Sequence, residues 1–237
     1  HCVVAEWLKD KPPGYVAAVV DADVAAVVLE RGLEQWIHHE ADVHLYEREW
    51  NEEIAAGNYM VRNTPFARAF LHSWAAWESR EPRGYNSYDN GALHAHLLEV
   101  LQLDGADECM SLWRNLVAPV GNLTQYYQFI RCTWRLLSPA RTWHVSDLNG
   151  WGGGKVQIWP RLTFWVIDSY LVYHARSSAV GHVFSHGIKQ PEQVVNHFYA
   201  DLDQCKLNMT HTLTSPAELV KRYTEFANLD FVRRFHS

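Results

Sequence analysis

One short segment constrains the fold of this chain more than any other. It is an unbroken apolar run at 15–20 that leads directly into Asp21 and Asp23. A strand that is apolar on both faces is typical of the buried centre of a parallel sheet. Because segments with helical periodicity alternate with such strands, the sequence indicates an α/β fold. We therefore expect a sheet flanked by helices, with the two aspartates at the carboxyl end of one strand.

Further elements follow the same alternation. Short strands are predicted at 43–46 and within 53–61. Thr64 is a suitable helix N-cap, and Pro65 then takes the first helical position. Asp89 begins another helix, in which leucines recur on one face. The chain is long enough to bury a proper hydrophobic core without disulfides.

The later part of the chain is less regular. Residues 109–176 are rich in tryptophan and are predicted to form strands and loops. A capping box at 215–218 predicts a C-terminal helix. We therefore expect one α/β domain over residues 1–212 and a helical tail over residues 213–237.

Composition removes two function classes. The chain has 237 residues, of which 48% are hydrophobic and 20% are charged, and this is the composition of a globular protein. Its formal net charge of −6 disfavours a nucleic-acid partner, because such proteins carry a basic field. The most apolar stretch, 15–29, contains two aspartates and is too short to span a membrane.

Cysteines and glycosylation sequons say little about the compartment. The 4 cysteines permit two disulfides and require none. They are Cys2, Cys109, Cys132 and Cys205. The sequons at Asn122 and Asn208 are compatible with a secretory compartment, but chance alone supplies such sites.

Several catalytic motifs are incomplete. The glycine cluster at 152–155 has Val156 where a phosphate-binding loop needs Ser or Thr, so it is expected to be a flexible loop. Ser185 lacks the glycine frame of a serine hydrolase. No dinucleotide-binding glycine pattern occurs in the chain.

The histidines also fail the spacing of a zinc helix. His39 and His44 are one residue too far apart to share a helical face, so they are expected to be surface residues. His94 and His96 are two residues apart in a predicted helix. At most one of them can face any given site.

The two aspartates remain as the candidate site. Ligands of open parallel sheets bind outside the carboxyl ends of the strands. Asp21 and Asp23 would repel each other there unless a cation lay between them. Their hard oxygen ligands suit Mg²⁺ or Mn²⁺, which could hold a diphosphate. The alternative is that both aspartates only end the strand and cap the next segment.

Five stretches of the sequence together resemble one family. The segment 19–23 resembles the DxD motif of glycosyltransferases with the GT-A fold, which hold a nucleotide-sugar diphosphate through Mn²⁺. The other four are 1–5, 53–64, 89–94 ("DNGALH") and 185–189 ("HGxK"). In this order they resemble a nematode-rich, uncharacterised family of nucleotide-diphospho-sugar transferase-like proteins. The resemblance spans most of the chain and implies a GT-A-like, Rossmann-like mixed sheet flanked by helices.

The resemblance also implies a role for each matching residue. The metal ligands would be Asp21, Asp23 and His186, with His182 as the alternative if the loop register differs. The donor-binding residues would be Gly57, Gly187 and Lys189, of which the lysine would contact the diphosphate. The residues beside the transferred sugar would be Asp89 and Asn90. Asp89 also stands where a plain helix N-terminal carboxylate is favoured, and this alternative stays open.

The sequence departs from the related families at several positions. Ala55 stands where they often have Asn, Leu29-Glu30 where they usually have Asn-Pro, and Ile188 where they often have Trp. Only 20 residues precede Asp21, whereas a GT-A domain normally places two or more strands there. We therefore expect the domain to be incomplete at its N-terminus, and any membrane anchor to lie in the missing part.

Three functions are compatible with these features. The first is a metal-dependent glycosyltransferase of the Golgi lumen that moves a sugar from a nucleotide-diphospho-sugar, such as a UDP-sugar, to a glycan or glycoprotein, with retention of configuration by analogy. The second is a non-catalytic, degenerate transferase of the secretory pathway that binds glycans. The third is a metal-dependent phosphoesterase, which would need a second cluster of carboxylates and histidines.

Overall fold

The computed structural model describes residues 1–26, 31–49, 51–138, 141–168 and 183–187. The chain forms two compact units that interleave along the sequence. The first contains residues 1–19, 40–47 and 51–158, and the second contains residues 20–39, 48–50 and 159–237. Each unit has its own sheet in the described residues.

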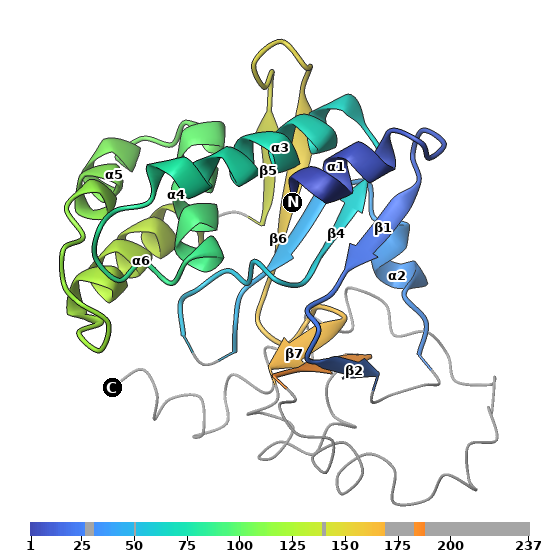
Figure 1. The fold of residues 1–237 in the computed structure, drawn as a ribbon. Helices are drawn as coiled ribbons and strands as arrows, with labels where there is room; N and C mark the ends of the chain where they lie inside the picture. Colours follow the sequence, from blue (N-terminus) through green and yellow to red (C-terminus); the bar gives the residue numbers. More distant parts are fainter. Residues whose placement is uncertain (27–30, 50, 139–140, 169–182, 188–237) are drawn as a thin grey trace, which may run out of the picture. The chain divides into compact units, whose positions relative to one another are not determined.

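The first unit is built on a five-stranded sheet (Figure 1). Its strands, in spatial order, are β1 (Val16–Val19), β4 (Tyr59–Arg62), β3 (Val43–Tyr46), β6 (Gly154–Trp159) and β5 (Thr142–Val145). The pairs β1–β4, β3–β4 and β5–β6 are antiparallel. The strand predicted at 43–46 is confirmed, and the one predicted within 53–61 forms slightly later, as β4.

The first strand differs from its prediction. β1 is antiparallel to β4, with Val16 opposite Arg62, and it is one of the two end strands in the order of the described sheet. Ala17 is buried, but Ala18 is exposed and Val19 is half-buried. The prediction of a buried centre of a parallel sheet is wrong. Small apolar side chains are tolerated at exposed positions, so an apolar run does not by itself require burial on both faces.

Helices of the first unit begin where the sequence predicts. Thr64 caps α3 (Pro65–Ala75), because its Oγ1 accepts a hydrogen bond from the Ala67 N–H at 3.1 Å. A 3₁₀ turn, η1 (Ala76–Arg80), follows it, and α4 (Asp89–Leu101) begins at Asp89. α1 (Cys2–Leu8) packs beside α3 (Figure 1). The core shared by these helices and the sheet includes Leu8, Phe66, Phe70, Leu71, Leu93 and Leu97.

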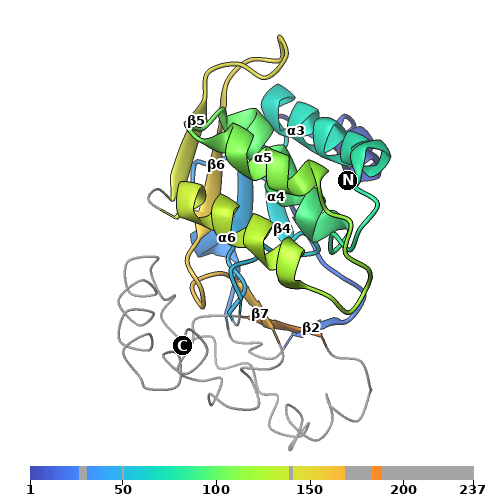
Figure 2. The same cartoon turned by 90° about the vertical axis from the view of Figure 1, so that its left-hand side faces the viewer.

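The middle of the chain is the largest error of the prediction. Within 109–176 the structure has strands β5 and β6, but it also has two helices, α5 (Ala106–Arg114) and α6 (Thr124–Leu137). The buried positions of α6 are Tyr126, Phe129, Ile130, Thr133 and Leu137. They recur at helical spacing, and that spacing outweighs the preference of aromatic residues for strands. Figure 2 shows α4, α5 and α6 gathered together.

A disulfide joins two of these helices. Cys109 of α5 is bonded to Cys132 of α6, and both belong to a second, largely helical core of the first unit. Cys2 is an exposed free thiol, and Cys205 lies outside the described residues. The sequence permitted this bond but did not select its partners.

Two histidines predicted at the surface have different environments. His44 on β3 is fully buried, with its Nε2 at 3.1 Å from the Ala41 carbonyl oxygen. The surface prediction is wrong for this residue, because β3 is buried along its whole length. His39 is half-buried and packs edge-on against Trp159.

The second unit has a smaller, mixed sheet. Its strands, in spatial order, are β2 (Val24–Ala26), β8 (Phe184–His186) and β7 (Val166–Asp168). β2 is antiparallel to β8, whereas β7 is parallel to it. A short helix, α2 (Glu34–Ile37), contributes the buried Trp36, whose Nε1–H donates to the Thr163 carbonyl oxygen at 3.1 Å. Trp36 packs edge-on against the buried Phe164, which in turn contacts the buried Trp165.

The predicted fold class is confirmed at its coarser level. The chain is a mixed α/β protein with helices and a mixed sheet. In the part of the chain that the structure describes, no helix combines the length and apolarity needed to cross a membrane. The C-terminal helix predicted to begin at the capping box 215–218 and the domain boundary predicted at 212 lie outside the described residues.

Candidate metal centre

The acidic pair lies in the turn that enters the second unit. β1 ends at Val19 and β2 begins at Val24, so Asp21 and Asp23 occupy the connection between them. β2 pairs with β8 in a register that sets Val24 opposite His186. The next residue after β8 extends this pairing, because the Gly187 N–H donates to the Asp23 carbonyl oxygen at 3.1 Å. Sheet pairing thereby brings a histidine from far along the chain beside the acidic turn.

Gly187 has a specific conformational role at this point. Its φ is 87°, in the left-handed region that side chains with a Cβ rarely adopt. This conformation lets the chain turn directly after β8 while its N–H still reaches Asp23. The glycine of the HGxK motif is therefore explained by the local backbone.

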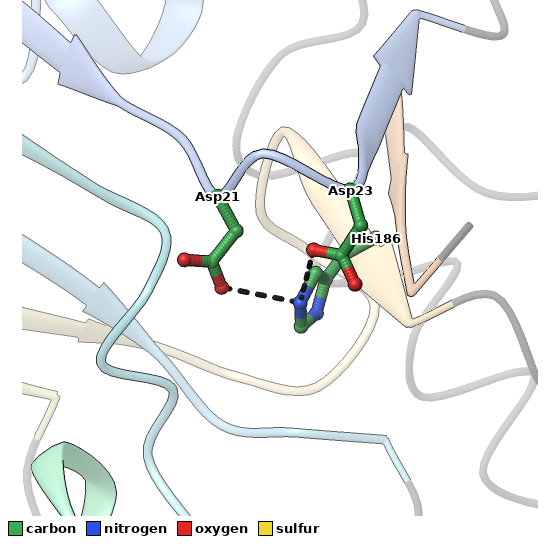
Figure 3. Close-up of side chains that lie close together, drawn as sticks. All are labelled: Asp21, Asp23 and His186. Atoms are coloured by element: carbon green, nitrogen blue, oxygen red, sulfur yellow. Dashed lines mark ion pairs between the residues drawn. The ribbon is translucent and has the colours of Figure 1, made fainter. Parts of the chain in front are cut away.

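The three side chains converge on a shared point (Figure 3). His186 Nε2 lies 3.2 Å from Asp21 Oδ2 and 3.3 Å from Asp23 Oδ1. One ligand atom from each residue lies within 4.8 Å of the other two. The His186 and Asp23 side chains are 18% and 19% exposed, and Asp21 is 43% exposed. The site is sheltered on the protein side and open at Asp21.

These distances suit a six-coordinate cation. With metal–ligand bonds of about 2.1 Å, neighbouring ligand atoms of an octahedron are about 3.0 Å apart. The two His186–Asp distances are slightly longer, so small movements would complete half of such a shell. The donor set of two carboxylates and one imidazole fits Mn²⁺, and it admits Mg²⁺ when water fills the remaining positions. A protonated imidazole held between two carboxylates is the alternative arrangement.

Asp168 is a candidate that sequence reasoning did not single out. The parallel pairing of β7 and β8 places Asp168 beside His186 in register. The signal was present, because 165–168 is a short apolar segment that ends in an aspartate, as 15–21 is. Its backbone position makes Asp168 a residue to test together with the cluster.

The other predicted site residues belong to the first unit. Asp89 is the exposed first residue of α4, and its Oδ1 accepts the Asn90 N–H at 2.9 Å. This is the contact expected of a helix N-terminal carboxylate, the alternative that the sequence left open. Gly57 is half-buried and lies just before β4. His182 and Lys189 lie outside the described residues.

Two of the family-like motifs turn out to be one structural device. Asn90 Oδ1 accepts the Ala56 N–H at 2.9 Å, and His94 Nε2 accepts the Ile54 N–H at 2.8 Å. Asn90 and His94 are four residues apart on one face of α4. The DNGALH helix therefore holds the backbone that leads into Gly57, and this accounts for both motifs without any ligand.

Hydrogen bonds fix the state of His94. Because its Nε2 accepts the Ile54 N–H, the proton is on Nδ1, which lies 2.7 Å from Thr133 Oγ1. Thr133 in turn donates to the Ile130 carbonyl oxygen at 2.8 Å. Complete burial lowers the pKa of His94 to about 4, and the charge of Glu53 opposes this shift only in part. His94 is a neutral structural residue at physiological pH.

Glu53 completes the same buried network. Its Oε1 accepts the Tyr126 hydroxyl at 2.6 Å, and its Oε2 accepts the Asn51 side-chain amide at 2.9 Å. Burial, and then the negative charge of Glu53, raise the pKa of Tyr126 well above its ordinary value. Sequence reasoning missed this network, since no spacing along the chain links residues 53 and 126.

Comparison with known proteins gives the family and no function. Residues 1–200 match the family model described as "Protein of unknown function, DUF273". The chain belongs to this family. No curated protein and no solved structure matches the chain.

Proposed function

We propose that the chain is a metal-dependent glycosyltransferase with a GT-A-like fold, which transfers a sugar from a UDP-sugar or related donor to a glycan or protein. The observation that carries the proposal is the convergence of Asp21, Asp23 and His186. Three residues that a DxD and an HGxK motif would supply as ligands come from segments about 160 residues apart and meet at one point. Two strand-end aspartates that only capped a turn would not need a distant imidazole between them.

Each residue of the cluster has a defined task in this proposal. Asp21, Asp23 and His186 hold Mn²⁺ or Mg²⁺ at the end of the small sheet. A bound divalent ion neutralises the charge that grows on the diphosphate as its bond to the sugar breaks. Gly187 keeps the backbone close to the site, and Lys189 adds a positive charge for the leaving diphosphate.

The proposed sugar-side residues, Asp89 and Asn90, are the first two residues of α4. Asp89 is the exposed first residue of α4, so its carboxylate is accessible to a substrate. Asn90 Oδ1 is used to hold Ala56, which leaves its amide N–H groups for a sugar hydroxyl. Retention of configuration is proposed only by analogy with GT-A families.

The competing functions differ in their need for the metal. A degenerate, glycan-binding transferase would bind glycans equally well with and without EDTA. A phosphoesterase would need a second acidic and histidine cluster, and the described residues contain one such group, Asp21 with Asp23 and His186. The single cluster in the described residues therefore fits the glycosyltransferase better than the phosphoesterase.

The proposed compartment is the secretory pathway, with the Golgi lumen as the place of the transfer. A disulfide between Cys109 and Cys132 persists in oxidising compartments. Asn122, the first residue of one sequon, is exposed in the turn before α6. Expression in a secretory host should give an N-glycosylated protein that loses mass with an amidase specific for N-glycans. If an Asn122→Gln variant carries as much N-glycan as the wild-type protein, Asn122 is not glycosylated.

A donor screen tests the enzyme. A panel of nucleotide sugars is incubated with the protein and Mn²⁺, and release of the nucleoside diphosphate is measured. We expect hydrolysis of one donor, loss of it with EDTA, and a fall of at least about a hundredfold in Asp23→Asn, because the metal contributes several kcal/mol to such reactions. Asp104→Asn removes an exposed carboxylate outside the cluster and should have no effect.

Binding gives a second, independent measurement. Mn²⁺ with UDP should raise the melting temperature of the protein, and Asp23→Asn should abolish the shift. Mn²⁺ binding without any response to nucleotides would support the metal site and contradict the transferase proposal. The absence of any response to Mn²⁺ would contradict both the metal site and the transferase proposal.

A further inference from the structure

A pocket of about 370 Å³ opens in the first unit, between helices α1 and α3 and the loop that joins β5 to β6. Its volume lies within the roughly 300–1,000 Å³ typical of small-molecule sites. The polar and aromatic residues that line it are Lys9, Arg68, His72, Ser73, Asn149 and Trp151. None of them belongs to the metal cluster or to the motifs of the proposed donor site.

Trp151 is presented to solvent on an ordered loop. Its side chain is 60% exposed, although its own N–H donates to the Leu148 carbonyl oxygen at 3.0 Å. Asp147 accepts the N–H groups of Gly150 and Gly152 at 2.8 and 2.7 Å, and both glycines have positive φ. Figures 1 and 2 show this loop projecting beyond the helices. A large aromatic ring held in water by a built turn favours a partner that covers it.

The helical side of the pocket is basic. Lys9, Arg68 and His72 line it, and no acidic residue does. Glu6 lies beside it and pairs with Lys9 at 2.7 Å and with His72 at 2.9 Å. The hydrogen bond from Lys9 lowers the pKa of Glu6, so this carboxylate offsets part of the charge. Arg68 leaves a net positive charge at the pocket of a chain whose formal net charge is −6.

Together these walls match one class of ligand. A pyranose has one apolar face of C–H groups, which packs on the electron-rich face of a tryptophan, and a rim of hydroxyls that need donors and acceptors. Ser73 Oγ donates to the Ala69 carbonyl oxygen at 2.8 Å and lies 3.5 Å from His96 Nε2, which leaves one lone pair for a hydroxyl. The Asn149 amide supplies both donors and acceptors. Arg68 Nη1 donates to Asn63 Oδ1, and the remaining guanidinium N–H groups can hold a carboxylate or sulfate.

We propose that this pocket binds a saccharide that carries a carboxylate or sulfate group, stacked on Trp151 with its anionic group at Arg68. A nucleotide is less suited to it, because a base has two apolar faces and Trp151 is the one large aromatic side chain of the lining. The proposal does not rest on the transferase activity, since it needs only binding at this pocket.

Saturation-transfer NMR on the 237-residue chain tests the proposal. The probes are sialyllactose, glucuronic acid and N-acetylglucosamine 6-sulfate, with lactose and N-acetylglucosamine as neutral partners. We expect transfer to at least one charged probe and an affinity at least about tenfold above that of its neutral partner, as charge-assisted hydrogen bonds imply. Uridine monophosphate is the nucleotide control.

Matched variants locate the binding. Trp151→Ala should lower the affinity for the charged probe by about tenfold or more. The control is Trp7→Ala, which removes another exposed tryptophan, 43% exposed and outside the lining, and should leave the affinity unchanged. Arg68→Ala should abolish the preference for the charged probe, and Arg83→Ala, at an exposed arginine elsewhere, should retain it. Unchanged melting temperatures show that each variant is folded.

Other results overturn the proposal. They are the absence of transfer to every charged sugar, wild-type affinity in Trp151→Ala, equal affinity for charged and neutral partners, and stronger binding of uridine monophosphate than of any saccharide. None of these results depends on Mn²⁺, so failure here leaves the transferase proposal standing, and failure of the donor screen leaves this one standing.

Discussion

The two units of the chain use histidine and carboxylate side chains in opposite ways. In the first unit, His94 and Glu53 are buried, and neighbouring groups satisfy them through hydrogen bonds. In the second unit, Asp21, Asp23 and His186 are partly exposed and point toward one another. Buried and satisfied groups hold a structure together, whereas partly exposed titratable groups that converge on one point are candidates for binding a ligand.

The comparison separates motifs that look alike in the sequence. Both DNGALH and HGxK contain a glycine and a histidine, and both resemble family motifs. The histidine follows the glycine in DNGALH and precedes it in HGxK. Only burial distinguishes them: His94 is fully buried, and the His186 side chain is 18% exposed. We therefore expect changes at the buried His94 network to act on stability and changes at Asp21, Asp23 and His186 to act on metal binding.

Acidification should lower the free energy of unfolding more than any other change, and it should act through the buried histidines of the first unit. Burial lowers the pKa of His94 to about 4 and that of His96 to about 3. Each neutral histidine stabilises the fold fully above the unfolded-state pKa of about 6.5, and this contribution is lost as pH falls toward the folded-state value. Between pH 7 and pH 4 we expect a loss of about 3 kcal/mol for each histidine, measured by urea unfolding.

A variant that does not titrate assigns this pH dependence. His94→Gln keeps an amide oxygen that can accept the Ile54 N–H and removes one proton-binding group. The pH slope of its unfolding free energy should fall by about half. An unchanged slope would show that other groups cause the acid sensitivity, and the contrast between the units would lose its strongest support.

Loss of the disulfide should cost less, again in the first unit. Cys109 and Cys132 are separated by 23 residues, for which loop-closure entropy gives about 3 kcal/mol. The double variant Cys109→Ser with Cys132→Ser should unfold at lower urea concentration by this amount. Cys2→Ser changes an exposed free thiol and is the control. Equal stability of the two variants would contradict the prediction.

Asn90 sharpens the comparison, because it has both a structural contact and a proposed catalytic role. Asn90→Leu leaves the Ala56 N–H without its acceptor and should destabilise the protein by about 1–3 kcal/mol. Asn90→Asp keeps an acceptor oxygen and should be closer to wild type in thermal unfolding. If Asn90→Asp is stable but has lost donor hydrolysis, the amide itself acts on the sugar. If both variants keep activity, Asn90 is structural alone.

His186 should give the smallest effect on stability and the clearest effect on binding. His186→Ala removes one of three ligands, so we expect Mn²⁺ affinity, measured by calorimetry, to fall by at least about tenfold. Because the side chain is partly exposed, unfolding free energy without metal should change by less than about 1 kcal/mol. His94→Ala is the matched change in the first unit. It should lower the free energy of unfolding and leave the Mn²⁺ affinity unchanged. A metal affinity that is indifferent to His186 would contradict the cluster.

Local signals predicted much of the fold. The N-cap at Thr64, the helix start at Asp89 and the strand at 43–46 depend on neighbouring residues, and all three are confirmed. The aromatic composition of 109–176 was misleading, because strand preference of single residues is weaker than the helical spacing of buried ones in α6. The prediction for β1 failed for a related reason, since apolar character does not specify which strands lie beside it.

The sequence by itself determined the chemistry that is available: two aspartates after an apolar run, a histidine before a flexible glycine, and helices with clear starting residues. Tertiary structure alone decided which of these groups meet. The pairing of β2 with β8 brings His186 to the acidic turn, and the packing of α4 buries His94 and ties it to Ile54. The physical reason is that sheet register and burial depend on contacts between segments far apart in the chain, whereas capping and helical periodicity depend on residues within a few positions of one another.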